Sequence, residues 1–298
     1  MPTTVDQTQS PMVEVRNLAK RFDGRTVLDG INLKVYSGEI MVIMGGSGSG
    51  KSTILRHLIG SFIPDEGDVF LFGKNLNDLD ENGLNEIRKR FGILFQSGAL
   101  FQSMTVAENV ALPLQEHTTL DQVIIDLQVK IKLELVGLRE HAEKYPSQIS
   151  GGMKKRAGLA RALALDPSIL FYDEPSAGLD PVTSAGIDRL IMDLSSKLGV
   201  TSVVVTHDMG SAFRIADRMA MLDAGRMLRI EPRSYFENLR SVEGDLPEDE
   251  ALIRQFIRGD DEGPITERKT ATNYVEDLIG IVEPSLSSEP SVQPTRPR

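Results

Sequence analysis

The chain lacks two residue types and any long apolar run. Among its 298 residues there is no cysteine and no tryptophan, and aromatic residues make up only 5%. The absence of cysteine excludes a disulfide framework, a thiolate zinc site and a thiol nucleophile, and it fits a reducing cytoplasm. No apolar run approaches the ~18–20 residues that a membrane-spanning helix requires. We therefore expect a soluble chain that meets any membrane through a partner.

Charge and composition narrow the classes of protein further. A net charge of −10 argues against a nucleic-acid binder that works by phosphate neutralisation. The hydrophobic content of 40% is enough for a substantial core, in one large domain or two small ones. Residues 1–10 form a polar leader without the apolar core of a signal peptide. The composition predicts a globular protein.

Glycine is concentrated in one segment with the pattern of a phosphate-binding loop. An apolar run over 40–44 reads as a buried strand, and the residues from Thr53 to Ile59 have helical spacing. Between these two segments lies the sequence Gly45-Gly46-Ser47-Gly48-Ser49-Gly50-Lys51-Ser52. Backbone N–H groups of such a P-loop point at phosphate oxygens, and the following helix adds its positive dipole end. Lys51 would reach the β- and γ-phosphates, and the Ser52 hydroxyl would bind Mg²⁺. The alternative is a flexible Gly/Ser turn.

Hydrophobic periodicity elsewhere predicts an alternating α/β chain. Strands are expected over 12–18, 31–35, 68–72, 91–95, 169–172, 202–206 and 218–222, and helices over 81–90, 120–136, 234–239 and 248–257. The segment over 147–156 is expected to open a further helix that runs through Leu165. Thr105 and Glu108 form a capping box, and Pro113 is expected to interrupt the helix that follows. Asp180 is a helix N-cap with Pro181 in the first helical position.

Acidic side chains follow the apolar strand over 169–172. In an α/β sheet, ligands bind at the carboxyl ends of the strands. Asp173, at the strand tip, can hold the Mg²⁺ that Ser52 binds, and Glu174 can polarise a water for attack on the γ-phosphate. A solvated acidic pair is the alternative.

Two further polar residues occupy the same position on other strands. Gln96 follows the strand over 91–95 and could reach the metal or the attacking water, with a surface glutamine as the alternative. His207 follows the strand over 202–206 and could contact the γ-phosphate; a structural histidine that caps the next helix is the alternative.

Three other segments are candidates for contacts. Phe22, an aromatic ahead of the P-loop, could stack on a nucleotide base or be an ordinary core side chain. Ser150-Gly151-Gly152 at a helix N-terminus offers backbone donors, a hydroxyl and a helix dipole as a second anion site, although the same sequence is common in loops. The small, apolar loop over 97–101 is either a docking surface or a buried loop.

Taken together, these motifs follow the order and approximate spacing of the ATP-binding-cassette ATPases, which residues 12–230 resemble. The resemblance implies ATP and Mg²⁺ as cofactors and an α/β fold: a P-loop NTPase of ABC type, whose RecA-like core carries an N-terminal antiparallel β subdomain and an inserted helical subdomain at about 97–165. It also implies a role for each candidate residue: Phe22 stacks on adenine, and the Q-loop glutamine Gln96 binds the metal together with Ser52 and Asp173. The signature motif includes Ser150, Gly151 and Gly152. Glu174 is the catalytic base, Asp180 is the D-loop aspartate, and His207 is the switch histidine. The signature departs from the family at Met153, where glutamine is usual; the phosphate contacts belong mainly to the serine and backbone.

The same resemblance implies a second copy of the chain as partner. Cassette ATPases work as head-to-tail dimers in which each ATP is held between the P-loop of one subunit and the signature motif of the other. Such a closed two-site interface is isologous and has twofold symmetry. ATP would favour the closed state and hydrolysis would release it.

Closer features resemble the ATPase subunit of Mla-type phospholipid transporters, namely residues 95–101 and 150–156. This implies a location at the cytoplasmic face of the inner membrane, a multispanning permease that docks near 97–101, an MCE-domain lipid-binding protein and a small regulatory subunit. The alternatives are an amino-acid or other solute importer and a soluble cassette ATPase of translation or DNA repair. We expect the ATPase domain over 11–258, and a tail over 259–298 that is disordered or latches onto a partner through the apolar residues at 274–282.

Overall fold

The structure, a computed structural model, describes residues 10–267 in two compact units that divide after Val242. The sequence had placed this boundary at residue 258, because the helical pattern over 248–257 looked continuous with the domain before it. Most of the predicted polar leader and the apolar residues at 274–282 lie outside the described residues.

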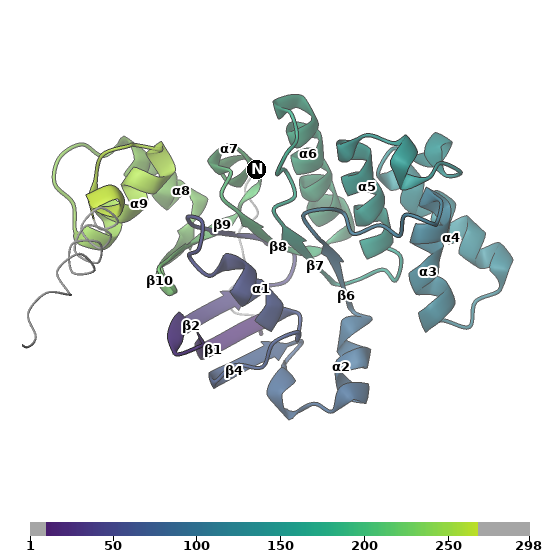
Figure 1. Ribbon diagram of the computed structural model, residues 1–298, viewed down its shortest axis with the longest axis horizontal. Helices are drawn as coiled ribbons and strands as arrows, with labels where there is room; N and C mark the ends of the chain where they lie inside the picture. The colour runs from purple at the N-terminus through teal and green to yellow at the C-terminus, as the bar shows by residue number, and fades with distance from the viewer. Residues whose placement is uncertain (1–9, 268–298) are drawn as a thin grey trace, which may run out of the picture. The chain divides into compact units, whose positions relative to one another are not determined.

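The first unit contains two sheets (Figure 1). The antiparallel sheet has the order β2-β1-β4-β5 and consists of β1 (Val13–Phe22), β2 (Arg25–Val35), β4 (Glu66–Leu71) and β5 (Lys74–Asn75). The larger sheet has the order β10-β9-β3-β8-β7-β6 and consists of β3 (Ile40–Met44), β6 (Phe91–Leu94), β7 (Ile169–Asp173), β8 (Thr201–Thr206), β9 (Arg218–Asp223) and β10 (Arg226–Pro232). All its strands run parallel except β10. The sequence analysis had not predicted the edge strands β5 and β10.

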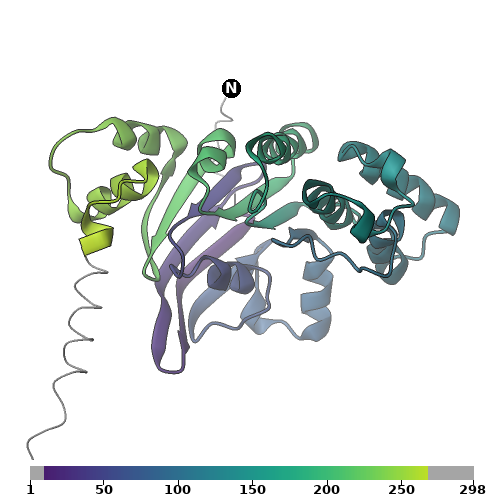
Figure 2. The same cartoon turned by 45° about the horizontal axis from the view of Figure 1, so that its top comes forward.

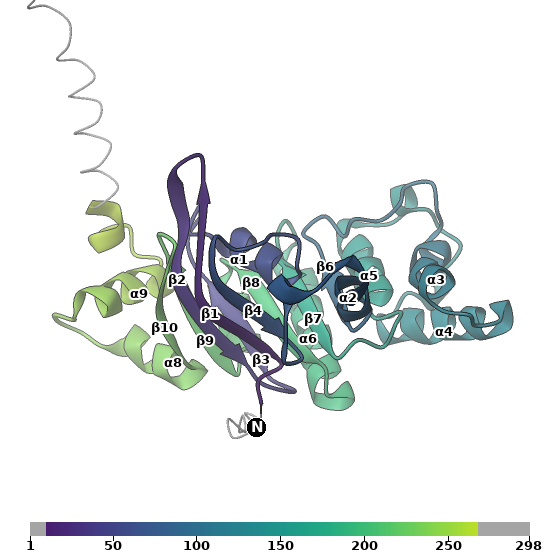
Figure 3. The same cartoon turned by 90° about the horizontal axis from the view of Figure 1, so that it is seen from below.

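Helices surround the larger sheet in two groups. The helices of the first unit are α1 (Lys51–Leu58), α2 (Glu81–Arg88), α3 (Val106–His117), α4 (Gln122–Leu135), α5 (Gly151–Ala162), α6 (Pro181–Leu198), α7 (Met209–Ile215) and α8 (Arg233–Ser241). Helices α6 and α7 lie on one side of the larger sheet, whereas α1 and the antiparallel sheet lie on the other (Figures 1 and 3). Helices α3 and α4 gather with α5 at one end of the unit, and the β1–β2 hairpin extends beyond its neighbours (Figure 2).

The core explains why the central strands are almost wholly apolar. Every residue of β3 is buried, as expected for a parallel strand covered on both faces. A hydrophobic cluster joins side chains of both sheets with Ile54, Leu55 and Leu58 of α1. Helix α1 is therefore held between the sheets, and the loop before it is fixed at the carboxyl end of β3.

One predicted interruption was wrong. The capping box of Thr105 and Glu108 is present at the start of α3, but Pro113 lies inside that helix and does not end it. Proline removes one helical hydrogen bond. The helix continues because buried Val110 and Leu114 lie on either side of Pro113 and anchor both turns to the core.

A buried carboxylate connects α6 with α7. Asp188 of α6 has no exposed surface, and it accepts hydrogen bonds from the Ser211 hydroxyl and the Arg214 guanidinium of α7. Because a buried charge is tolerated only when it is paired, this triad fixes the two helices to each other.

The second unit is built around α9 (Glu248–Arg258), which ends at Gly259 in a left-handed conformation with φ 77°. The side chain of Gln255 turns the following segment back onto the helix: it accepts from the Ile265 amide at 2.7 Å and donates to the Thr266 hydroxyl at 2.8 Å.

Candidate active site

Strand register brings the predicted site residues to one edge of the larger sheet. Met44, the last residue of β3, pairs with Thr206 of β8, and Val205 pairs with Asp173 of β7. The P-loop, His207 and Glu174 therefore leave three adjacent strands at nearly the same level. Because β7 also pairs with β6, Gln96 leaves the sheet at this edge as well.

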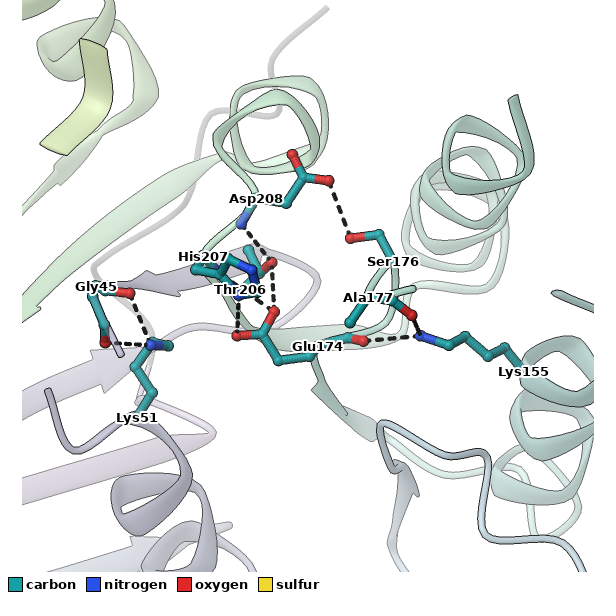
Figure 4. Close-up of polar contacts among 10 residues, drawn as sticks. Gly45, Lys51, Lys155, Glu174, Ser176, Ala177, Thr206, His207 and Asp208 are labelled. Atoms are coloured by element: carbon teal, nitrogen blue, oxygen red, sulfur yellow. Dashed lines mark hydrogen bonds and ion pairs between the residues drawn. The ribbon is translucent and has the colours of Figure 1, made fainter. Parts of the chain in front are cut away.

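The P-loop is folded as a cradle around a lysine. Gly50 has φ 106°, a conformation that L side chains rarely adopt, and it turns the chain into α1. The Lys51 ammonium donates to the carbonyls of Gly45 and Gly46, both at 2.8 Å, and is buried (Figure 4). The lysine is thus already positioned in the concave side of the loop.

Two features of the loop suit a phosphate group. Burial lowers the pKa of Lys51, and the nearby charges of Glu174 and Asp173 partly offset this. An anion beside the ammonium would favour its charged form. The Ser49 hydroxyl is buried and has no hydrogen-bond partner, so it offers a donor that a phosphate oxygen can satisfy.

The carboxylate of Glu174 is held by the end of β8. One oxygen accepts from the Thr206 hydroxyl at 3.1 Å, and the other lies 2.9 Å from Nδ1 of His207 (Figure 4). The His207 side chain is 64% exposed whereas that of Glu174 is 13% exposed, so the histidine is the more accessible of the two. A carboxylate oriented in this way can accept a proton from a water molecule.

Asp173 and Ser52 have the donor chemistry of a magnesium site. Burial raises the pKa of Asp173, and the charge of Glu174 adds to this rise, so a cation would be favoured there. Within residues 10–267 there is no cluster of three His, Cys, Asp or Glu side chains that could hold a metal by itself. Mg²⁺ in phosphoryl-transfer sites is usually held by one or two carboxylates together with substrate phosphates, so this set fits.

The loop after Gln96 is exposed but firmly held. Gln96 and Phe101 are exposed, whereas Leu100 is buried. The Arg161 guanidinium donates to the carbonyls of Gly98 and Ala99, and fully buried Asn109 accepts from the Phe101 amide at 2.8 Å. The loop therefore presents some side chains to solvent on a fixed backbone, between the two predicted alternatives.

The second predicted anion site is only partly open. Ser150 caps α5 and accepts from the Met153 amide, and both Ser150 and Gly151 are exposed. Gly152 is buried, and a Cβ atom there would lie 2.4 Å from Cγ2 of Thr183 in α6. Close packing of α5 against α6 is thus a structural reason for this glycine.

Phe22 lies at the end of β1 and is 39% exposed. Its ring is 5.6 Å from that of Phe62, which in turn contacts the His57 ring of α1. One face of the side chain is therefore packed near the P-loop helix while part of it stays accessible, which is compatible with base stacking.

The structure excludes one of the two readings of His207 and gives Asp180 a local role. Asp208, and not His207, is the N-cap of α7, so the capping alternative for the histidine was wrong. Asp180 caps α6 and accepts from the amides of Val182 and Thr183, both at 3.0 Å. The pKa of Asp180 is lowered, mainly by the hydrogen bond from the Thr183 hydroxyl.

Several residues that position the site were missed by sequence reasoning. They are Thr206, which contacts Glu174, Lys155, which donates to the carbonyls of Glu174 and Ala177, and Arg161 and Asn109, which hold the loop after Gln96. Only Thr206 carried a usable signal, because it immediately precedes His207. The contacts of Lys155 and Arg161 join segments far apart in the chain, whereas that of Asn109 spans eight residues.

A groove of about 970 Å³ lies beside the loop that follows Gln96. Its walls come from α2, β6, α3 and the end of α5, with Phe95, Pro113 and Arg161 among its lining residues. The side chain of Phe95 is 40% exposed.

Comparison with known proteins assigns the family. The sequence model of a protein family described as ABC transporter matches residues 28–177. The chain belongs to the ABC transporter family, and the prediction of a cassette ATPase that hydrolyses ATP is confirmed.

Particular relatives make the assignment narrower. The chain is 41% identical to the intermembrane phospholipid transport system ATP-binding protein MlaF of Haemophilus influenzae, over 90% of this chain and 98% of that protein. It is also 41% identical to the probable ribonucleotide transport ATP-binding protein mkl of Mycobacterium leprae, over 89% of this chain and 74% of that protein. The predicted resemblance to Mla-type ATPases is thereby confirmed.

A solved structure supports the fold. The dimeric ATP-binding cassette MJ0796 in a post-hydrolysis state with ADP and Pi matches 74% of this chain and 99% of its own, with a TM-score of 0.69 and 35% identity. Within the described residues, no helix has the length and apolar character needed to cross a membrane.

Proposed function

We propose that this chain is the ATP-hydrolysing subunit of an ABC transporter that moves phospholipid through a separate permease at the inner membrane. The observation that carries this proposal is the 41% identity to MlaF over 98% of that protein. It is combined with strand register that brings the P-loop, Glu174 and His207 to one edge of the larger sheet. The subunit would lie peripherally at the cytoplasmic face.

Hydrolysis assigns a separate task to each residue of the sheet edge. Lys51 and the P-loop amides bind the phosphates, with Ser49 as an additional donor. Glu174 takes the proton of the attacking water, and the hydroxyl of Thr206 keeps its carboxylate in place. His207, 2.9 Å from that carboxylate and more exposed, contacts the γ-phosphate.

Magnesium would be held by Ser52 and Asp173, with Gln96 reaching the same site from β6. When bound, Mg²⁺ neutralises charge that develops on the transferred phosphoryl group. Asp173 favours its binding because it is partly buried, with a raised pKa that a neighbouring cation would lower.

A second copy of the chain would complete each nucleotide site. Ser150 and Gly151 are exposed at the positive end of α5, and within residues 10–267 no hydrogen bond joins them to the P-loop of their own subunit. The solved relative with ADP and Pi is a dimer. The signature residues of each subunit, together with Asp180, would meet the nucleotide bound by the partner's P-loop.

The groove beside the Gln96 loop is the proposed docking site for the permease. It is lined partly by exposed Phe95, and the adjacent loop presents exposed Phe101 on a backbone fixed by Arg161 and Asn109. A cytoplasmic helix of the permease could insert its apolar side chains there. An MCE-domain protein and a small regulatory subunit would complete the assembly.

Two relatives suggest different cargo. The name of MlaF specifies phospholipid and that of mkl specifies ribonucleotide, at the same 41% identity. The match to MlaF extends over 98% of that protein, compared with 74% for mkl. This end-to-end agreement favours phospholipid.

Affinity capture from detergent-solubilised membranes of the native host tests the assembly. We expect a multispanning permease and an MCE-domain protein to be recovered together with phospholipid, as identified by mass spectrometry. Recovery with an amino-acid or nucleotide permease would contradict the cargo, and recovery without any membrane protein would favour a soluble cassette ATPase.

A Glu174→Gln variant tests the hydrolytic site. Because Glu174 is assigned the base role and no binding role, turnover should fall by at least about 100-fold, the typical contribution of a general base. ATP-bound dimers should accumulate and persist in size-exclusion chromatography with ATP. A variant that remains monomeric with ATP, or one that retains wild-type turnover, would refute the assignment.

A further inference from the structure

The side chain of Lys155 is a buried cation without an acidic partner. It lies on α5, is 5% exposed, and makes no ion pair with any residue that the structure describes. Its ammonium donates instead to two backbone carbonyls, those of Glu174 at 3.1 Å and Ala177 at 2.7 Å. Burial lowers the pKa of Lys155, whereas Glu174 acts in the opposite direction. A buried charge of this kind is costly, so its retention calls for a specific role.

The turn that Lys155 binds contains an unfavourable backbone conformation. Glu174 has φ 49°, in the left-handed region, and it precedes Pro175, which further restricts its backbone. The turn is closed by a hydrogen bond from the Ala177 amide to the Glu174 carbonyl at 3.2 Å. Lys155 binds the carbonyls at both ends of this turn. Such a conformation persists only where surrounding contacts enforce it.

We infer that Lys155 is a positioning residue for hydrolysis: it holds the turn over 174–177 so that the Glu174 carboxylate stays against Thr206 and His207. This inference rests on the proposed role of Glu174 as the base. In Figure 4, Lys155 reaches Glu174 from the side opposite to Lys51. It does not approach the phosphate cradle, so it acts through the backbone of the turn over 174–177.

The inference also connects two parts of the site within one subunit. Lys155 lies on the helix that Ser150 caps, little more than one turn from its N-terminus. A displacement of α5 would therefore pull on the turn that carries Glu174. In the proposed dimer, contact of the partner's nucleotide with α5 would set the position of the base beside the subunit's own nucleotide.

Steady-state ATPase kinetics of Lys155 variants test this role. Lys155→Met removes the donors but keeps a long apolar side chain, and we expect kcat to fall by about 10- to 100-fold, the effect of misplacing a reacting group by about 1 Å. The KM for ATP should stay within about threefold of wild type, because the P-loop is unchanged. Lys155→Arg keeps charge and donors and should recover most of kcat. Lys154→Met, which removes the same charge from the same helix, should keep kcat within about twofold.

A second background separates positioning from general stability. In Glu174→Gln, adding Lys155→Met should leave the ATP-bound dimers unchanged, since the side chain that Lys155 positions is no longer the base. Loss of those dimers would show a structural or binding role and overturn the inference. So would a wild-type kcat in Lys155→Met, or equal losses in kcat for Lys155→Met and Lys154→Met.

Two outcomes need their own interpretation. If Lys155→Met does not fold, Lys155→Gln replaces it: its shorter side chain cannot bond both carbonyls, so a lowered kcat with unchanged KM supports the inference and a wild-type kcat overturns it. A wild-type protein without ATPase activity would refute the proposed function itself. An active wild type together with a wild-type kcat in Lys155→Met refutes only the inference about Lys155.

Discussion

The P-loop and the N-terminus of α5 both offer backbone donors to an anion, but they differ in how complete they are. The P-loop surrounds a buried lysine, includes an unsatisfied serine hydroxyl and is anchored between two sheets. The N-terminus of α5 has only an exposed serine, an exposed glycine and the helix dipole. We propose that the first binds phosphate by itself. The second has no cation, so it can contribute to a site but cannot bind a triphosphate alone.

The difference is also visible in how each glycine is used. Gly50 serves the ligand site, because its φ of 106° allows the chain to curl around Lys51. Gly152 serves packing, because Thr183 leaves no room for a side chain there. The glycines of these two similar sequences are therefore required for different physical reasons.

The largest effect is expected when the P-loop and the N-terminus of α5 are disabled in separate subunits, which tests whether they form one site between subunits. Lys51→Ala should abolish nucleotide binding at the P-loop. Gly151→Asp should repel phosphate at α5, and it fits sterically because the nearest atom to a Cβ there is 3.9 Å away. Each variant alone should lose at least about 100-fold in ATPase activity. A mixture should recover roughly a quarter of wild-type activity, because half of randomly paired dimers contain one intact site of two.

Gly151→Ala is the matched control for this mixture, since it adds the Cβ without the charge and should stay active. If the mixed variants remain as inactive as each alone, the halves do not combine between subunits and the dimer proposal fails. Retained activity in Lys51→Ala alone would contradict the P-loop assignment.

A smaller effect is expected at Phe22, which sharpens the P-loop side of the comparison. Base stacking contributes about 1–3 kcal/mol, so Phe22→Ala should raise the KM for ATP by roughly 5- to 150-fold with little change in kcat. Phe22→Tyr retains a stacking face and should behave as wild type. Because stacking reads no base edges, the KM for GTP should lie within about tenfold of that for ATP. A strict requirement for ATP would show that other groups read the base.

The smallest effect concerns the free energy of unfolding at acidic pH, and it tests the helix that follows the P-loop, α1. His57 of α1 is buried and its pKa is lowered by burial. Protonation is therefore easier in the unfolded chain, so the contribution of His57 to stability is complete above about pH 6.5 and decreases as the pH falls below it.

His57→Asn removes this titration and keeps a donor for the Thr53 carbonyl, which Nδ1 contacts at 2.8 Å in the wild type. Denaturant unfolding between pH 5 and pH 8 should show that the variant loses less stability on acidification, by up to about 1.4 kcal/mol per pH unit. Parallel pH profiles for both proteins would contradict the buried, neutral state of His57.

Sequence alone predicted the parts of the site that depend on local patterns. Gln96, Asp173 and His207 were found because each follows an apolar strand, and parallel strands bring their carboxyl ends to one edge. The capping box at Thr105 was found because its partner lies only three residues away.

Contacts between distant segments left no comparable signal. Lys155 and Glu174 are brought together by the packing of α5 against the end of β7, which a single sequence does not reveal. Pro113 was misread for the same reason: local propensity predicts an interruption, whereas tertiary burial of its neighbours keeps the helix intact. The division after Val242 likewise depends on which helices pack together.

The buried carboxylate of Asp188 has a mechanical consequence. Helix α6 begins immediately after Asp180, and α7 begins two residues beyond His207. Since Ser211 and Arg214 bind Asp188, α6 and α7 are expected to move as one rigid body. A displacement of Asp180 at the start of α6 would therefore also displace His207, which precedes α7.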